Sequence, residues 1–210
     1  YDPHLLYESE KLVCILSEKI RQGRQIRIIG DYDIDGVMST YILYQGITRC
    51  GGSVSCAIPD RMRDGYGINE HLIDAAYEEG MDTIITCDNG IAALEQVRLA
   101  KELGMTVIVT DHHEVVRAED GSQILPEADA VVNPHRDDCP YPFAGICGGV
   151  VAYKLVQVLY EQNRIPEQEW KDMLEFAAIA TVGDVMKLQD ENRIIVRWGL
   201  KQIPHTASAG

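Results

Sequence analysis

Residues 26–36 read IRIIGDYDIDG, a short apolar run that ends on three aspartates at alternate positions. Asp31, Asp33 and Asp35 supply the oxygen ligands that hard divalent cations prefer. The same spacing opens the EF-hand calcium loop, which also needs a helix in front and a glutamate at its twelfth position. Here the twelfth position is Ile42, and the residues in front are strand-like. The pattern therefore indicates a strand that leads into a metal site, rather than an EF-hand.

The composition is that of an ordinary globular protein. The 210 residues are 46% hydrophobic and 25% charged, which suffices for one large domain. No apolar run approaches the roughly 20 residues of a membrane span, and the first ten residues do not resemble a signal peptide. We therefore predict a cytoplasmic protein without membrane contact. The net charge of −14 argues against binding nucleic acid through overall electrostatics, although bound divalent cations would reverse the local polarity.

The cysteine pattern does not indicate a zinc or disulfide framework, because no C-x-x-C pair occurs. Two of the cysteines, Cys56 and Cys87, lie in apolar strand-like runs. We predict buried free thiols for the set. Its six members are Cys14, Cys50, Cys56, Cys87, Cys139 and Cys147.

Apolar residues alternate along the chain between strand-like and helix-like spacing. Strands are expected at 26–29, 53–58, 82–86, 105–110 and 130–132. Helices are expected at 4–22, 37–49, 68–79, 91–103, 148–163 and 167–182. This alternation predicts an α/β fold with a mainly parallel sheet of about five strands, helices on both faces, and additional C-terminal helices.

Polar side chains follow four of the expected strands. They are Asp31, Asp33, Asp35, Asp88, Asp111, His112, His113 and Asn133. In an open α/β sheet the ligand crevice lies outside the carboxyl ends of the strands, so these side chains should converge on one pocket. Carboxylates with one or two imidazoles are a ligand set typical of Mn²⁺ or Mg²⁺ rather than of a zinc site built from thiolates. A zinc site built from carboxylates and histidines remains an alternative.

Each of these features also has a purely structural interpretation. Any one of the first three aspartates could cap the following helix. Asp88 precedes Asn89 and Gly90, which together are a turn signal, and the histidine pair fits a solvated loop. The structural interpretations require three coincidences at three equivalent strand ends, so we favour a joint functional site.

Five ordered motifs resemble those of the DHH phosphoesterases, and most closely those of the RecJ-like single-stranded-DNA exonucleases. They are DYDIDG (31–36), TCDNGI (86–91), VTDHHE (109–114), VVNPHRDD (131–138) and ATVGDVMKLQDENR (180–193). The resemblance covers nearly the whole chain. The departures are Ile34 in place of alanine or valine, Gly183 and Lys187 in place of alanine and proline, and a shifted glycine in GGV (148–150).

The resemblance implies a centre with two divalent cations, Mn²⁺ or Mg²⁺, that hydrolyses phosphodiesters. The implied ligands are Asp33 and Asp88 for one ion, with Asp31 ligating or orienting, and Asp35, Asp88, His112 and Asp184 for the other. Asp184 is promoted by the resemblance alone. Asp111 is expected to orient the His112 imidazole, and His113 to contact the scissile phosphate or to supply a proton.

Substrate contacts are expected on a second group of residues. Arg61 and Arg63 beside Tyr66 combine phosphate-pairing guanidinium groups with an aromatic platform, as in proteins that hold single strands without sequence preference. His135 and Arg136 are further candidates for phosphate contact. Ordinary surface arginines are the alternative interpretation.

The resemblance also implies the biological role. Residues 1–200 would form the catalytic domain, and residues 201–210 would begin a linker to a second domain. The expected enzyme is a 5′-to-3′ exonuclease that releases mononucleotides from single-stranded DNA in repair and recombination, with a single-strand-binding protein or a helicase as protein partners. One alternative is a DHH phosphodiesterase acting on short oligonucleotides, cyclic dinucleotides or pyrophosphate. Another is a non-catalytic replication scaffold, which would be expected to have lost metal ligands.

Overall fold

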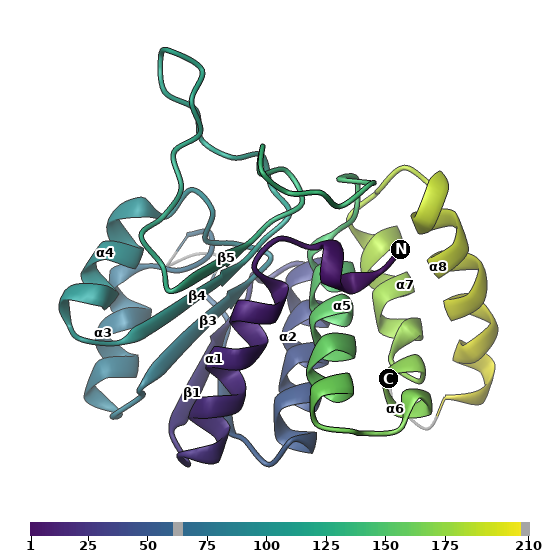
Figure 1. Ribbon diagram of the computed structural model, residues 1–210, viewed down its shortest axis with the longest axis horizontal. Helices are drawn as coiled ribbons and strands as arrows, with labels where there is room; N and C mark the ends of the chain where they lie inside the picture. Colours follow the sequence, from purple (N-terminus) through teal and green to yellow (C-terminus); the bar gives the residue numbers. More distant parts are fainter. Residues whose placement is uncertain (61–64, 207–210) are drawn as a thin grey trace.

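The computed structural model describes residues 1–60 and 65–206, so Arg61 and Arg63 lie outside the described residues. Five strands form one sheet in the order β2-β1-β3-β4-β5, and all neighbouring pairs are parallel (Figure 1). Their bounds are β1 Gln25–Ile29, β2 Ser53–Ala57, β3 Thr83–Cys87, β4 Thr106–Thr110 and β5 Ala130–Val132. The parallel pairing confirms the expected sheet. Each strand also lies within a residue or so of the segment whose apolar run predicted it.

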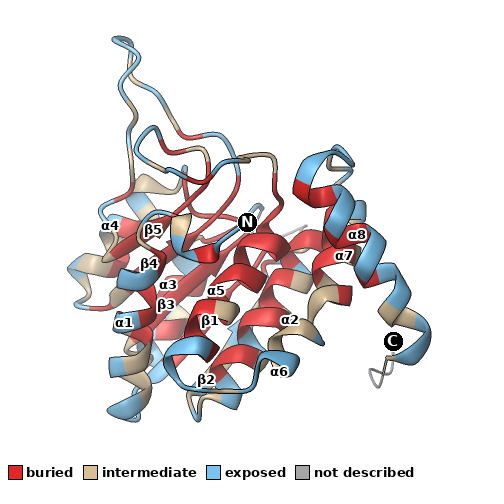
Figure 2. Ribbon diagram, turned by 45° about the vertical axis from the view of Figure 1, so that its right-hand side comes forward, coloured by how far each residue is buried: buried red, intermediate tan, exposed pale blue. Residues whose placement is uncertain are grey.

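Helices cover both faces of the sheet, as expected. One face packs against α1 (Ser9–Arg21), α2 (Ile34–Arg49) and α5 (Gly148–Gln162), and the other against α3 (Glu70–Glu78) and α4 (Leu94–Glu102). Alternate residues of a strand point to opposite faces, so Ile26 and Ile28 enter the first core and Ile29 enters the second. Figure 2 shows the strands buried between these layers.

The C-terminal helices form a further layer outside α2 and α5 (Figure 1). They are α6 (Glu167–Lys171), α7 (Leu174–Gly183) and α8 (Asp190–Gln202). The single helix expected at 167–182 is wrong, because the chain turns between α6 and α7. The turn brings Trp170 edge-on to Tyr153, with ring centroids 5.7 Å apart, and Phe176 edge-on to Tyr41, at 4.7 Å. The break therefore places an aromatic contact on each side of it.

The two ends of the described chain carry short 3₁₀ turns, η1 (Pro3–Leu5) and η2 (Ile203–His205). The helix expected from residue 4 therefore begins only at Ser9. The prediction of buried thiols holds for Cys87 and Cys147, but it is wrong for Cys14 and Cys56, which are exposed. Cys56 lies on β2, the edge strand, where one side of the sheet is open.

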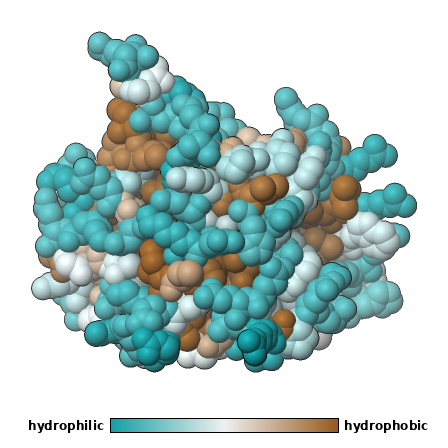
Figure 3. All heavy atoms as spheres, in the orientation of Figure 1, coloured by the Kyte–Doolittle hydropathy of each residue, from teal (hydrophilic) through white to brown (hydrophobic). Residues whose placement is uncertain are grey.

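Among the described residues, no helix is both long enough and apolar enough to cross a bilayer. The face of the molecule drawn in Figure 3 is mostly hydrophilic, with smaller hydrophobic patches between the charged side chains.

Candidate metal centre

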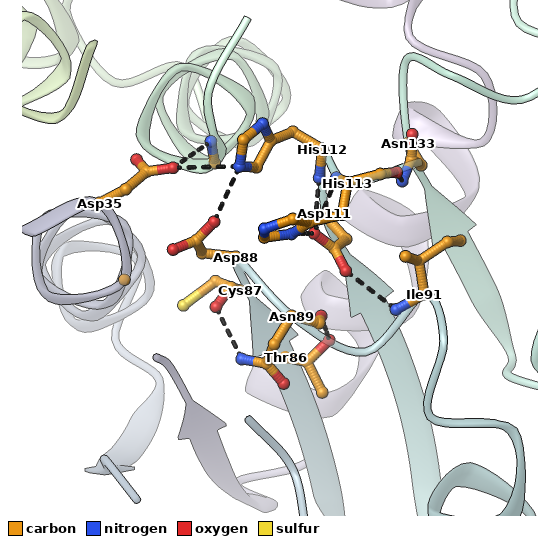
Figure 4. A network of polar contacts seen from close by, with 12 residues as sticks. Asp35, Thr86, Cys87, Asp88, Asn89, Ile91, Asp111, His112, His113 and Asn133 are labelled. Carbon is orange, nitrogen blue, oxygen red and sulfur yellow. Dashed lines mark hydrogen bonds and ion pairs between the residues drawn. The ribbon is translucent and has the colours of Figure 1, made fainter. Parts of the chain in front are cut away.

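Functional side chains from separate segments come together around His112 at the carboxyl end of the sheet; Figure 4 shows Asp35, Asp88 and His112 of this cluster. The Nε2 atom of His112 lies 3.0 Å from Asp88 Oδ1, 3.5 Å from Asp35 Oδ2 and 3.7 Å from Asp184 Oδ2. His112 follows β4, Asp88 follows β3, Asp35 lies in the first turn of α2, and Asp184 caps the C-terminus of α7. The convergence expected from parallel strand ends is therefore present, and the end of α7 completes it.

Three groups of side chains have possible ligand atoms within 4.8 Å of one another. They are Asp31 with Asp33 and Asp88, Asp35 with His112 and Asp184, and Asp88 with His112 and His113. Asp88 belongs to two of the groups. The first two groups contain all six ligands implied by the resemblance, but the second does not include Asp88, so the sharing of Asp88 by both ions stays a prediction.

The first motif combines a helix cap with the candidate ligands. The Gly36 N–H donates to Asp33 Oδ1 at 2.9 Å, so Asp33 caps α2, and the helix begins at Ile34 rather than near Val37. The capping interpretation is thus correct for Asp33, whose other oxygen remains available to a metal. Asp31 is buried, and its Oδ1 accepts the Tyr32 N–H at 2.8 Å.

Asp88 has an unusual backbone conformation and an unusual pKa. Its φ of 61° lies in the left-handed region, which Asp and Asn tolerate better than most residues. Burial, followed by the nearby charge of Asp35, raises the pKa of Asp88 to about 11. Asn89, which the sequence indicated only as a turn residue, holds this turn, because its side chain accepts the Ile68 N–H at 3.0 Å and donates to the Ile29 carbonyl at 3.1 Å.

The buried atoms of the cluster fit a divalent cation. Asp88 Oδ1 and His112 Nε2 are buried and lie 3.0 Å apart, but neither atom makes a hydrogen bond of acceptable geometry with any described residue. Buried polar atoms in folded proteins nearly always have a partner, and carboxylates with an imidazole match the ligand preference of Mn²⁺ and Mg²⁺. A cation would also offset the carboxylate repulsion that raises the pKa of Asp88.

The raised pKa makes Asp88 a source of instability when no metal is bound. An unfolded aspartate titrates near pH 4, so above that pH folding must bury a charge or take up a proton. This cost is absent below about pH 4 and grows as the pH rises toward 11. We expect Asp88→Asn to raise the free energy of unfolding in EDTA by about 5 kcal/mol at pH 8, because each of the four pH units above pH 4 adds about 1.4 kcal/mol. Urea denaturation at pH 4 and pH 8 checks this, and an equal gain at both values would contradict it.

The structure corrects the expected role of Asp111. Its Oδ1 lies 2.7 Å from the ring Nδ1 of His113, and it meets His112 only through the backbone N–H, also at 2.7 Å. Its Oδ2 accepts the Ile91 N–H at 2.9 Å. The carboxylate of Asp111 therefore orients His113 rather than the imidazole of His112. The hydrogen bond that the His113 ring makes to the Asp111 carboxylate raises the pKa of His113 to about 9, even though burial disfavours the charged imidazolium.

The expected substrate-binding residues differ in their surroundings. Arg136 is wrong as a phosphate contact, because its buried guanidinium already pairs with Asp138 at 2.8 Å and 2.9 Å and donates to the Val131 carbonyl at 2.6 Å. The Nδ1 atom of His135 lies 3.3 Å from Glu114 Oε1. Tyr66 is 75% exposed and lines a cavity of about 420 Å³ next to the metal centre.

That cavity has walls of two kinds. Its other lining residues include Asp31, Asp88, His113, Ile91 and Gln96. It therefore joins the carboxylates and His113 to an apolar wall, and the exposed ring of Tyr66 forms part of its lining. The Tyr66 ring packs against Tyr32, with their centroids 5.0 Å apart.

Known proteins resemble this chain in sequence. The family model "DHH family, N-terminal domain" matches residues 25–181. The single-stranded-DNA-specific exonuclease RecJ of Bacillus subtilis is 39% identical over 210 residues, which are 100% of this chain and 25% of that protein. This chain thus spans about a quarter of that relative's length.

Solved structures share the fold. An exonuclease RecJ bound to manganese matches with a TM-score of 0.84 and 33% identity, over 96% of this chain and 49% of that one. RecJ from Thermus thermophilus in complex with Mn²⁺ matches with a TM-score of 0.79 and 30% identity, over 96% of this chain and 28% of that one.

Proposed function

The chain belongs to the DHH family, and on that premise we propose that it is the catalytic domain of an exonuclease that hydrolyses single-stranded DNA from the 5′ end. The observation that carries the proposal is the buried cluster around Asp88 and His112, with two polar atoms that make no hydrogen bond of acceptable geometry with any described residue. The names of the RecJ relatives support the choice of substrate. Proposed protein partners are a single-strand-binding protein or a helicase, which hold or generate single strands.

The proposed ligands form two sets. Asp31, Asp33 and Asp88 would hold one divalent cation. Asp35, His112 and Asp184 would hold the other, and Asp88 would join them, because its Oδ1 lies 3.0 Å from His112 Nε2. Two such cations activate water and stabilise the attacking and leaving oxygens of a displacement at phosphorus. The ions proposed are Mn²⁺ or Mg²⁺, since oxygen ligands dominate both groups.

His113 and Asp111 have a proposed role in proton transfer and phosphate binding. With a pKa of about 9, His113 is largely protonated at neutral pH. Its Nδ1 is tied to Asp111 at 2.7 Å, which leaves Nε2 as the atom that can donate to a phosphate oxygen or to the leaving oxygen. The negative charge of Asp111 keeps the imidazolium oriented and charged.

One experiment distinguishes the candidate activities. Wild-type protein is incubated with Mn²⁺ and with 5′-labelled single-stranded DNA, blunt duplex DNA or a dinucleotide, each with an EDTA control. We expect labelled mononucleotide from the single strand only, and none in EDTA. Cleavage of the dinucleotide alone would indicate a short-oligonucleotide phosphodiesterase, and no cleavage of any substrate would indicate a non-catalytic scaffold.

We expect Tyr66→Ala to raise KM for single-stranded DNA about tenfold with little change in kcat. Stacking of a base on an aromatic ring contributes about 1–3 kcal/mol to single-strand binding, and Tyr66 is exposed beside the cavity. Steady-state kinetics on a labelled oligonucleotide measures the effect. Tyr77→Ala is the matched control, because Tyr77 is also exposed but lies on α3; an equal rise in KM there would contradict a specific role.

A further inference from the structure

The amino terminus of α5 holds the carboxylate of Asp35. The Gly148 N–H donates to Asp35 Oδ2 and the Gly149 N–H donates to Oδ1, each at 2.7 Å. Among the described residues, Cys147, the residue at the N-cap position of α5, makes no side-chain capping bond. Asp35 therefore caps α5 from a different helix, and the partial positive charge of the α5 amino terminus stabilises the buried carboxylate.

A side chain at either glycine would collide with Asp35 and with a second segment, the turn after β3 at Gly148 and α7 at Gly149. A Cβ atom at Gly148 would lie 2.8 Å from Asp88 Cβ and 3.1 Å from Asp35 Oδ2. A Cβ atom at Gly149 would lie 3.1 Å from Asp35 Oδ1 and would overlap the Cβ of Ala180. Both glycines lie within an ordinary α-helix, so the close approach is the reason for them.

The two hydrogen bonds from backbone N–H groups hold the Asp35 carboxylate in place against the repulsion of neighbouring carboxylates. Asp35 lies near Asp88 and Asp184 in a buried cluster, and like charges at such distances repel each other. Each carboxylate oxygen can accept more than one bond, so both oxygens keep capacity for a further partner. Figure 4 shows the side chain directed from α2 toward Asp88 and His112.

We propose that Gly148 and Gly149 are positioning residues of the metal centre: their amides hold Asp35 in the orientation that binds a divalent cation, and their lack of side chains permits that contact. The inference rests on the proposed function, because it assigns these residues to the same centre. A ligand held in place before the metal arrives binds it more tightly, since less conformational freedom is lost.

The test compares two glycine-to-alanine variants of α2 and α5 by Mn²⁺ calorimetry and thermal melting. Gly148→Ala crowds Asp88 and Asp35, whereas Gly46→Ala places a Cβ 2.5 Å from Val156 Cγ2, in the contact between the same two helices. We expect both variants to melt at a lower temperature in EDTA. Only Gly148→Ala should weaken Mn²⁺ binding, by about tenfold or more, as loss of an outer partner of a metal ligand does.

A second pair of variants covers the case in which Gly148→Ala does not fold. In Gly149→Ala with Ala180→Gly, the overlap with Ala180 is removed and Asp35 Oδ1 remains the crowded neighbour. This double variant should bind Mn²⁺ more weakly than Ala180→Gly alone, because the added methyl group still displaces the carboxylate.

The outcomes separate this inference from the function on which it rests. The inference alone would be overturned if the wild type binds Mn²⁺ and Gly148→Ala binds it equally tightly. Equal Mn²⁺ affinity of the double variant and Ala180→Gly would also overturn the inference alone. Weakening by Gly46→Ala as large as that by Gly148→Ala would also overturn it. Failure of the wild type to take up Mn²⁺ would overturn both the proposed function and the inference.

Discussion

Asp88→Asn is expected to lower Mn²⁺-dependent cleavage of single-stranded DNA by about a thousandfold. Asp88 is grouped with Asp31 and Asp33 at one proposed cation site and lies 3.0 Å from His112 at the other, so its loss should weaken both sites at once. Stabilisation of transition-state charge by metal ions contributes several kcal/mol, and each 1.36 kcal/mol is a factor of ten in rate. Asparagine also tolerates the φ of 61° at this position, so the backbone should be preserved.

The control for Asp88→Asn is the same chemical change elsewhere. Asp120 lies in an exposed turn, where its carboxylate accepts the Ser122 N–H at 3.0 Å. Asp120→Asn should cleave single-stranded DNA at the wild-type rate. Single-turnover rates for the three proteins, together with their far-UV circular dichroism, provide the comparison. Wild-type cleavage by a folded Asp88→Asn variant would overturn the shared role of Asp88.

The second large effect concerns stability, at Glu191. Its Oε1 lies 2.6 Å from Lys154 Nζ, both residues are buried, and the Tyr141 hydroxyl donates to Oε2. Burial alone would raise the pKa of Glu191, but the charge and hydrogen bond of Lys154 hold it below its usual value. Glu191→Gln leaves the Lys154 ammonium buried without its counter-charge. We expect a loss of about 3 kcal/mol, or a melting temperature lower by about 10 °C.

Two further variants test this interpretation of Glu191. Adding Lys154→Met to Glu191→Gln removes the unpaired charge and should recover at least half of the lost stability. Glu95→Gln on α4, at an exposed pair with Arg98, should leave the melting temperature within about 2 °C of the wild type, because surface ion pairs contribute little. A melting temperature for Glu191→Gln as high as that of Glu95→Gln would contradict the prediction.

Much of the site was predictable because its residues directly follow strands. Asp31, Asp88 and His112 are placed by the ends of β1, β3 and β4, which parallel pairing brings to one edge of the sheet. Asp184 was not predictable from spacing, since an anion at a helix C-terminus is unfavourable without a compensating charge, and only the family resemblance indicated it. The break between α6 and α7 was not predicted either, because the apolar spacing of 167–182 continues through it, and the aromatic contacts with Tyr41 and Tyr153 on its two sides join segments distant in the chain.

Side-chain partners were the least predictable part of the site. Asp111 could reach either neighbouring histidine, and it is the tertiary structure that directs its carboxylate to the ring of His113. Arg136 follows a strand as a phosphate-binding residue would, yet its guanidinium is buried against Asp138 and the end of β5. Such partners depend on rotamers and on contacts between distant segments, neither of which a local sequence pattern specifies.

The sequence by itself determined the parallel α/β architecture and the edge of the sheet at which the carboxylates meet, because apolar periodicity specifies strands and the residues after them share one location. Only the tertiary structure decided how the aspartates of the first motif divide their roles. Asp33 caps its own helix, while Asp35 is held by amides of Gly148 and Gly149 from a helix far away in the chain. The reason is physical: a cap within one turn depends on local spacing, whereas a contact between two helices exists only when the whole core is packed.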